Sequence, residues 1–144
     1  MRFWDSSAIV PLCVDVPQAQ ATRGLLRVDR EMAVWWATRT ECISALARQV
    51  REGSIDRAGQ GQARTVLAEL GRVWAEVQPS EAVRSLAERL LVTHALRAAD
   101  AFQLAAAIQW RGAPPNDAEL VSYDGRLRAA AHAEGFVLLP AQSR

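Results

Sequence analysis

Two kinds of hydrophobic pattern alternate along the 144-residue chain. Short runs that are apolar at nearly every position are typical of strands covered on both faces of a parallel sheet. Longer segments repeat apolar residues at three- and four-residue intervals, which predicts helices with one buried face. We expect strands at 2–5, 32–36, 73–77, 119–123 and 136–139.

The segments between these strands have helical spacing. We expect helices at about 8–14, 17–29, 38–52, 55–71, 80–91, 96–110 and 125–134. Thr38 and Glu41 fit a capping box at the start of one helix, and Ser54 fits the N-cap of the next. Pro11 is tolerated only if it lies in the first turn of its helix.

The alternation of strands and helices predicts the fold class. We expect an α/β fold, a three-layer α/β/α sandwich with a mainly parallel central sheet. Residues 1–144 show no repeat, linker or low-complexity tract, and we expect them to form a single domain. Residues 111–117 have the turn chemistry of a surface loop.

Composition excludes several classes of function. Half of the residues are hydrophobic, 23% are charged and the net charge is +1, as in soluble domains and unlike a nonspecific nucleic-acid coat. All 17 basic residues are Arg, which excludes mechanisms that need a lysine amine. No apolar run is long enough to span a membrane and no signal peptide is evident, so we expect a cytoplasmic protein.

Asp100 stands near the start of the otherwise apolar segment 96–107. An ionised carboxylate in a buried helix is costly unless a charge, a metal or several donors compensate it. Two interpretations remain open. Asp100 forms an ion pair with Arg97, three residues earlier on the same face, or it is a metal ligand or catalytic acid.

Three further acidic residues share the predicted position of Asp100. Asp5 and Asp124 follow strands, and Glu41 lies in the first turn of a helix, so all four are expected at the carboxyl edge of the sheet. Each also has a simpler interpretation, respectively a helix cap, the Asp of an Asp-Gly turn and a capping-box Glu. Together they need a cation or protonation, because two carboxylates about 4 Å apart repel by roughly 4 kcal/mol. Oxygen ligands favour Mg²⁺ or Mn²⁺, and neither Cys13 nor Cys42 has the spacing of a zinc site.

Four segments in this order resemble the PIN-domain proteins of the VapC toxin type. They are Phe3–Val10 (FWDSSAIV), Thr40–Cys42 (TEC), Leu96–Ala107 (LRAADAFQLAAA) and Leu120–Leu127 (LVSYDGRL). No segment is specific alone, but the ordered set spans nearly the whole chain.

The resemblance implies a PIN-like fold and a Mg²⁺- or Mn²⁺-dependent ribonuclease, the toxin of a type II toxin–antitoxin pair. Its acidic quartet falls on Asp5, Glu41, Asp100 and Asp124, and its small hydroxyl residues fall on Ser7 and Ser122. It also implies an antitoxin partner, a homodimer, and hydrolysis that leaves a 5′-phosphate and a 3′-hydroxyl. This chain departs from the family at Gln103, where a His is frequent, and at Ser122, where Thr is commoner.

Two alternatives are kept. The first is a catalytically inactive PIN-like module that binds RNA or serves assembly. The second is a phosphatase of similar architecture, which the Asp5-Ser6-Ser7 segment and the lack of Lys disfavour. Arg97 is left with two roles, a pair with Asp100 or an approach to substrate phosphate.

Overall fold

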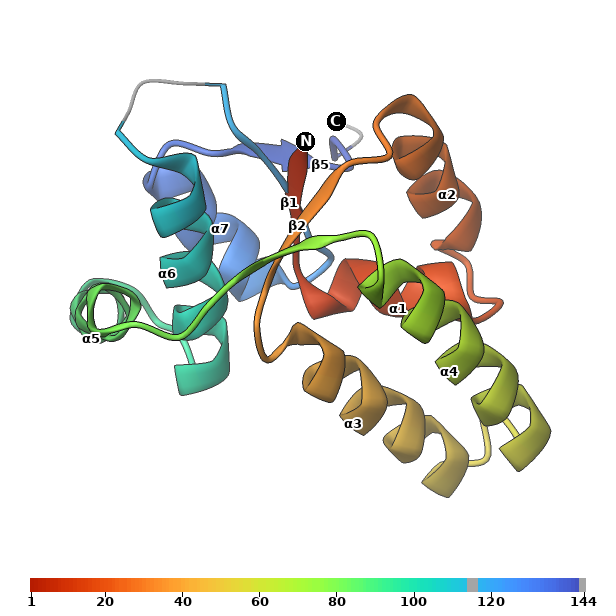
Figure 1. The fold of residues 1–144 in the computed structure, drawn as a ribbon. Helices are drawn as coiled ribbons and strands as arrows, with labels where there is room; N and C mark the ends of the chain where they lie inside the picture. Colours follow the sequence, from red (N-terminus) through yellow and green to blue (C-terminus); the bar gives the residue numbers. More distant parts are fainter. Residues whose placement is uncertain (114–116, 143–144) are drawn as a thin grey trace.

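In the described part of the chain, five short strands form one parallel sheet at the centre of the molecule (Figure 1). Their order in the sheet is β3-β2-β1-β4-β5. The computed structural model describes residues 1–113 and 117–142, so part of the predicted loop at 111–117 lies outside the described residues. The strands are β1 (Arg2–Trp4), β2 (Met32–Trp35), β3 (Ala75–Val77), β4 (Glu119–Val121) and β5 (Val137–Leu139).

Helices cover both faces of this sheet. They are α1 (Ser6–Cys13), α2 (Ala19–Val28), α3 (Thr38–Arg51), α4 (Arg57–Gly71), α5 (Glu81–Thr93), α6 (Ala98–Arg111) and α7 (Gly125–Ala133). Helices α1 to α4 pack in one hydrophobic cluster and α5 to α7 in the other, on opposite sides of the strands in Figure 1. The predicted three-layer α/β/α sandwich with a parallel sheet is confirmed. None of the helices within the described ranges is long and apolar enough to cross a membrane.

The apolar strands supply both cores. Phe3 and Trp4 are neighbours in β1, both are fully buried, and they belong to opposite clusters. Successive side chains of a strand point to opposite faces, so a strand covered on both sides needs apolar residues at every position. The uninterrupted apolar runs of the sequence have this origin.

The strand order creates a crevice at the carboxyl edge of the sheet. The chain runs outward from β1 through β2 to β3, then returns to place β4 on the other side of β1. The switch in direction therefore lies between β1 and β4. In open parallel sheets this is the place where ligands bind, because the loops that leave the two strands diverge.

Several element boundaries differ from the sequence-based prediction. Helix α1 begins at Ser6, capped by Asp5, so Pro11 lies beyond the first turn and the expectation for Pro11 is wrong. Thr38 is not an N-cap, because α3 is preceded by Ala37 without a side-chain cap. Asp56, rather than Ser54, caps α4 by accepting the N–H of Gly59 at 2.7 Å. The spacing of apolar residues predicted the helices correctly, but the residues that cap their first turns differ from the expected ones.

Candidate active site

All four acidic residues lie where elements begin at the carboxyl edge of the sheet. Asp5 follows β1 and caps α1, and Asp124 follows β4 and caps α7 by accepting the N–H of Leu127 at 2.7 Å. Glu41 and Asp100 lie in the first turns of α3 and α6. The cap interpretation of Asp5 is thus correct locally, whereas Asp124 is the N-cap of α7 and not the Asp of an Asp-Gly turn. Neither cap competes with a role at the crevice.

Asp5 is held in a fixed orientation by hydroxyl groups. Its Oδ2 accepts hydrogen bonds from the hydroxyls of Ser7 and Ser122, the latter at 2.9 Å, and from the Ser7 N–H at 3.3 Å. Only 4% of Asp5 is exposed. Burial raises the pKa of Asp5, the Ser7 and Ser122 hydrogen bonds lower it, and the charge of Asp124 raises it. The two serines therefore favour the ionised form against the effect of burial.

Glu41 is half-buried, and one of its carboxylate oxygens accepts two hydrogen bonds. Its Oε2 accepts from the side-chain amide of Gln103 at 2.8 Å and from the hydroxyl of Ser6 at 2.9 Å. Burial raises the pKa of Glu41, these two hydrogen bonds lower it, and the charges of Asp5 and Asp100 raise it. The capping-box interpretation of Glu41 is wrong. The required N-cap, Thr38, is a buried helical residue whose hydroxyl accepts from Gln103 at 3.0 Å.

Asp100 is half-buried among other carboxylates. Burial raises its pKa, the charges of Asp124 and Asp5 raise it further, and the Arg97 backbone and charge lower it. Within the described residues no ion pair of 4.0 Å or less joins Arg97 to Asp100. The negative charge of Asp100 is therefore only partly compensated by Arg97, and the simple ion-pair interpretation does not account for this residue.

The four carboxylates form one electrostatic group. Asp124 acts on Asp5 and Asp100, and Asp5 and Asp100 both act on Glu41. Oxygen-only donors that repel one another are the chemistry that suits a hard divalent cation such as Mg²⁺ or Mn²⁺. Yet in residues 1–113 and 117–142 no three Asp, Glu, His or Cys side chains are arranged to hold one ion. The chemistry of the donor set, carboxylate oxygens alone, nevertheless fits such a cation.

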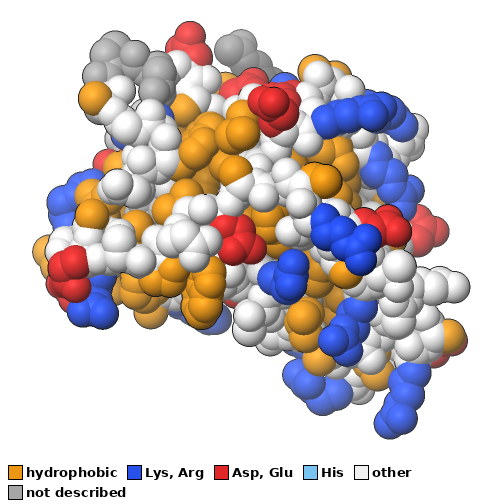
Figure 2. All heavy atoms as spheres, viewed as in Figure 1, with side chains coloured by type: hydrophobic (Ala, Val, Ile, Leu, Met, Phe, Trp, Pro, Cys, Tyr) orange, Lys and Arg blue, Asp and Glu red, His pale blue; other side chains and the backbone are white. Residues whose placement is uncertain are grey.

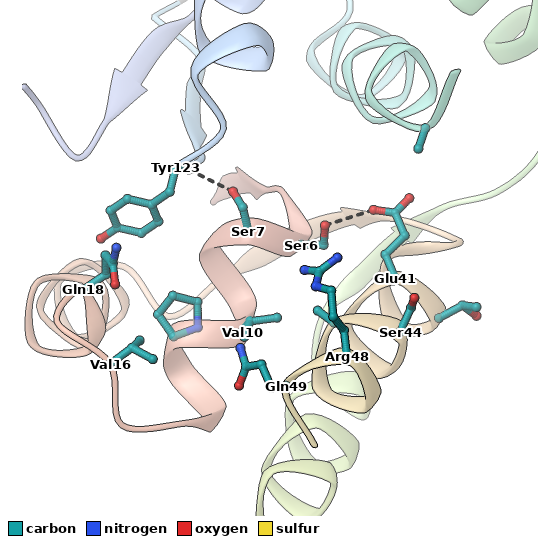
Figure 3. Close-up of a pocket in the computed structure, with 14 residues that line it drawn as sticks. Ser6, Ser7, Val10, Val16, Gln18, Glu41, Ser44, Arg48, Gln49 and Tyr123 are labelled. Atoms are coloured by element: carbon teal, nitrogen blue, oxygen red, sulfur yellow. Dashed lines mark hydrogen bonds between the residues drawn. The ribbon is translucent and has the colours of Figure 1, made fainter. Parts of the chain in front are cut away.

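Two pockets adjoin this acidic group. One, of about 610 Å³, is lined by Arg97, Ala99, Asp100, Asp124, Gly125 and Arg126. The other, of about 650 Å³, lies between α1 and α3 and contains Ser6, Ser7, Glu41 and Arg48 (Figure 3). Figure 2 shows basic side chains spread over the α3 and α4 half of the molecule, with hydrophobic ones between them.

Sequence reasoning missed two residues that contact the acidic group. Ser6 binds Glu41 across the α1–α3 contact, and its only signal was membership of the polar Asp5-Ser6-Ser7 segment. The sequence shows Gln103 as a departure from the family but does not predict its hydrogen bond to Glu41. A buried amide in an apolar helix, one turn after Asp100, was the signal that it has a polar neighbour.

Comparisons with known proteins support the fold through structure alone. No family model matches the sequence, and no curated protein matches it. Solved structures do match over nearly the full length.

The VapC20 toxin of Mycobacterium tuberculosis, described as cleaving the sarcin–ricin loop, superposes with a TM-score of 0.67 at 18% identity, over 90% of this chain and 95% of that one. A toxin–antitoxin complex from Klebsiella pneumoniae gives 0.66 at 16%, over 95% of this chain and 96% of that one. FitAcB of Neisseria gonorrhoeae gives 0.66 at 14%, over 96% of both chains. At these identities the likeness establishes the fold. The chain therefore has the PIN-like fold that its sequence motifs imply.

Proposed function

We propose that this protein is a divalent-metal-dependent endoribonuclease and the toxin of a type II toxin–antitoxin pair. The observation that carries the proposal is the electrostatic group of Asp5, Glu41, Asp100 and Asp124, whose charges act on one another although the residues come from four distant segments. Burial and repulsion among these carboxylates raise the pKa of Asp5, Glu41 and Asp100, and perturbed pKa values cluster at functional sites. The fold shared with the sarcin–ricin-cleaving toxin VapC20 supports the same activity.

The residues of the proposed site have two roles, metal binding and orientation of the metal-binding side chains. Asp5, Glu41, Asp100 and Asp124 would hold Mg²⁺ or Mn²⁺, which when bound supplies an activated water and neutralises charge on the scissile phosphate. Ser7 and Ser122 orient Asp5, and Ser6 and Gln103 orient Glu41. Hydrolysis by water leaves a 5′-phosphate and a 3′-hydroxyl.

The cationic residues beside the acids suit the substrate. Arg97 and Arg126 line the same pocket as Asp100 and Asp124, and both are exposed. A guanidinium group binds phosphate through paired N–H donors, so these two residues would hold the RNA backbone at the acidic group. Of the two roles left open for Arg97, the approach to phosphate is the one we propose.

We further propose an antitoxin partner and a homodimer. The neighbours from Klebsiella pneumoniae and Neisseria gonorrhoeae are a toxin–antitoxin complex and FitAcB, which supports a protein partner for this fold. Light scattering of the purified chain, alone and co-expressed with the product of an adjacent gene, measures both assemblies.

One observation favours a second candidate, an inactive module that binds RNA without cutting it. In the described part of the chain no three acidic side chains are arranged for one metal ion. Such a module would bind RNA and leave it intact with either cation present.

The test is incubation of the purified chain with mixed cellular RNA, a DNA strand and a small phosphomonoester, with Mg²⁺, Mn²⁺ or EDTA. The proposal expects metal-dependent cutting of RNA alone. Bound but intact RNA would establish the inactive module, and hydrolysis of the phosphomonoester would establish a phosphatase.

A further inference from the structure

The pocket between α1 and α3 has a lining that the carboxylates alone do not explain. Its volume is about 650 Å³, Glu41 and Ser6 lie at one side, and Val10, Pro11 and Val16 supply an apolar wall. Figure 3 shows Glu41, Ser44 and Arg48 projecting from α3 toward the side chains of α1. The pocket thus has a polar side that includes Glu41 of the acidic group and an apolar wall.

Arg48 is the cationic group of this pocket. Its side chain is exposed, and Figure 3 shows it reaching from α3 across the pocket toward Ser6. Across residues 1–113 and 117–142, no hydrogen bond or ion pair binds its guanidinium group. Arg48 is also absent from the charges that shift the pKa of Glu41. Its five donors are therefore available to an anion from solution.

The second pocket places two further cationic groups beside the acids. Arg97 and Arg126 line that pocket together with Asp100 and Asp124, and Ala99 lines both pockets. The acidic group is therefore flanked by guanidinium groups in two adjoining pockets. A single phosphate would occupy one pocket only, whereas a polyanion with regularly spaced phosphates can contact the guanidinium groups of both pockets at once.

We propose that Arg48 binds a backbone phosphate of the RNA beside the cleaved bond, so that the strand leaves the acidic group through the pocket between α1 and α3. The apolar wall of Val10 and Val16 then packs against the sugar and base of that nucleotide. The inference rests on the proposed function, because it takes RNA as the substrate. Arg48 is a positioning residue in this account, since it touches the strand away from the reacting phosphate.

The test compares Arg48→Ala with Arg51→Ala. Arg51 lies three residues later on the same helix, is exposed, and does not line the pocket. Cleavage of a labelled RNA pool gives KM and kcat. Binding of the same pool is measured in EDTA across a salt series. Arg48→Lys keeps the charge, and thermal unfolding shows that each variant is folded.

Arg48→Ala is expected to raise KM by about tenfold with little change in kcat, because it removes binding equal in ground and transition states. The plot of log affinity against log salt concentration has a negative slope, and the magnitude of this slope should decrease by about 0.7. This is the contribution of one phosphate contact on a single strand. Arg48→Lys should restore the slope, and Arg51→Ala should leave both values unchanged.

Two outcomes overturn the inference, and they are distinguishable. If the wild-type chain cleaves RNA but Arg48→Ala matches Arg51→Ala in KM and salt slope, the proposed function stands and the pocket has another occupant, such as an antitoxin segment. If the wild-type chain neither binds nor cleaves the pool, the proposed function fails and this inference fails with it.

Discussion

The hydroxyl of Ser122 donates a hydrogen bond of 2.9 Å to the carboxylate of Asp5 and so joins the end of β4 to the end of β1. The two residues are 117 positions apart in the sequence, and their contact lies at the switch point of the sheet. Ser7 donates to the same oxygen and lies 3.3 Å from the Ser122 hydroxyl. The hydroxyl pair holds one oxygen of Asp5, and the other oxygen accepts a hydrogen bond from the Ser6 hydroxyl at 3.3 Å.

Ser122→Ala should weaken divalent-metal binding by roughly 10- to 100-fold, the usual cost of removing a group that orients a metal ligand. The buried Asp5 loses a donor to its charged form, so its pKa should rise further. Titration calorimetry with Mn²⁺ measures the change, and Ser85→Ala on the exposed side of α5 is the control. Equal affinity in Ser122→Ala and wild type would show that the hydrogen bond does not orient a ligand.

The raised pKa values of Asp5, Glu41 and Asp100 predict how stability depends on pH without metal. Folding favours the protonated forms, so the folded chain binds more protons than the unfolded chain above the ordinary pKa values of 3.8 for Asp and 4.5 for Glu. The stability these groups contribute is complete below those values and is lost as pH rises through the raised pKa values.

Asp100→Asn imitates the protonated form and should therefore be more stable than wild type at pH 7 in EDTA. The difference should disappear near pH 3, where the wild-type carboxyl is itself protonated. Urea unfolding at both pH values measures it, with the exposed Asp15→Asn as control. A constant difference at both pH values would show that the effect does not arise from ionisation of Asp100.

Gln103→Leu should shift the acidic limb of the pH–activity profile to higher pH. Gln103 donates to Glu41 at 2.8 Å, and its loss leaves a half-buried carboxylate with one donor fewer, which raises the Glu41 pKa. Activity at neutral pH should fall by about tenfold. Gln109→Leu, on the exposed face of the same helix, is the control. An unmoved limb would contradict the role given to Glu41.

Arg128→Met should reduce the free energy of unfolding by about 2–3 kcal/mol. The Arg128 guanidinium donates to the carbonyls of Ser122 at 2.7 Å, Leu139 at 3.0 Å and Pro140 at 2.9 Å, which ties α7 to the ends of β4 and β5. Urea denaturation measures the loss against Arg126→Met, whose side chain is exposed two residues earlier. Equal loss in both variants would mean that the three bonds contribute little.

The sequence predicted those features that depend on local pattern or strand order. Phe3 and Trp4 indicated a strand buried on both faces, and both are fully buried. The positions of Asp5 and Asp124 followed from the rule that parallel strands end at one edge.

Features that depend on packing between helices could not be predicted. Thr38 has the residue type of an N-cap, but in the folded chain its hydroxyl accepts from Gln103, a residue 65 positions away. The pairing of Ser6 with Glu41 likewise depends on how α1 packs against α3. Neither contact leaves a periodic signal, because each joins single residues of helices whose spacing is explained by other positions.

The most direct test of the central claim is the rate of RNA cleavage by wild type and Asp100→Asn at saturating Mn²⁺, with Asp15→Asn as the matched control. The account predicts that wild type and Asp15→Asn cut RNA to 5′-phosphate ends and that EDTA stops them. Asp100→Asn, folded and at least as stable, should cut at least 100-fold more slowly, roughly the rate effect of removing a transition-state-stabilising group. Equal rates of RNA cleavage by Asp100→Asn and wild type would contradict the claim that Asp100 belongs to the catalytic site.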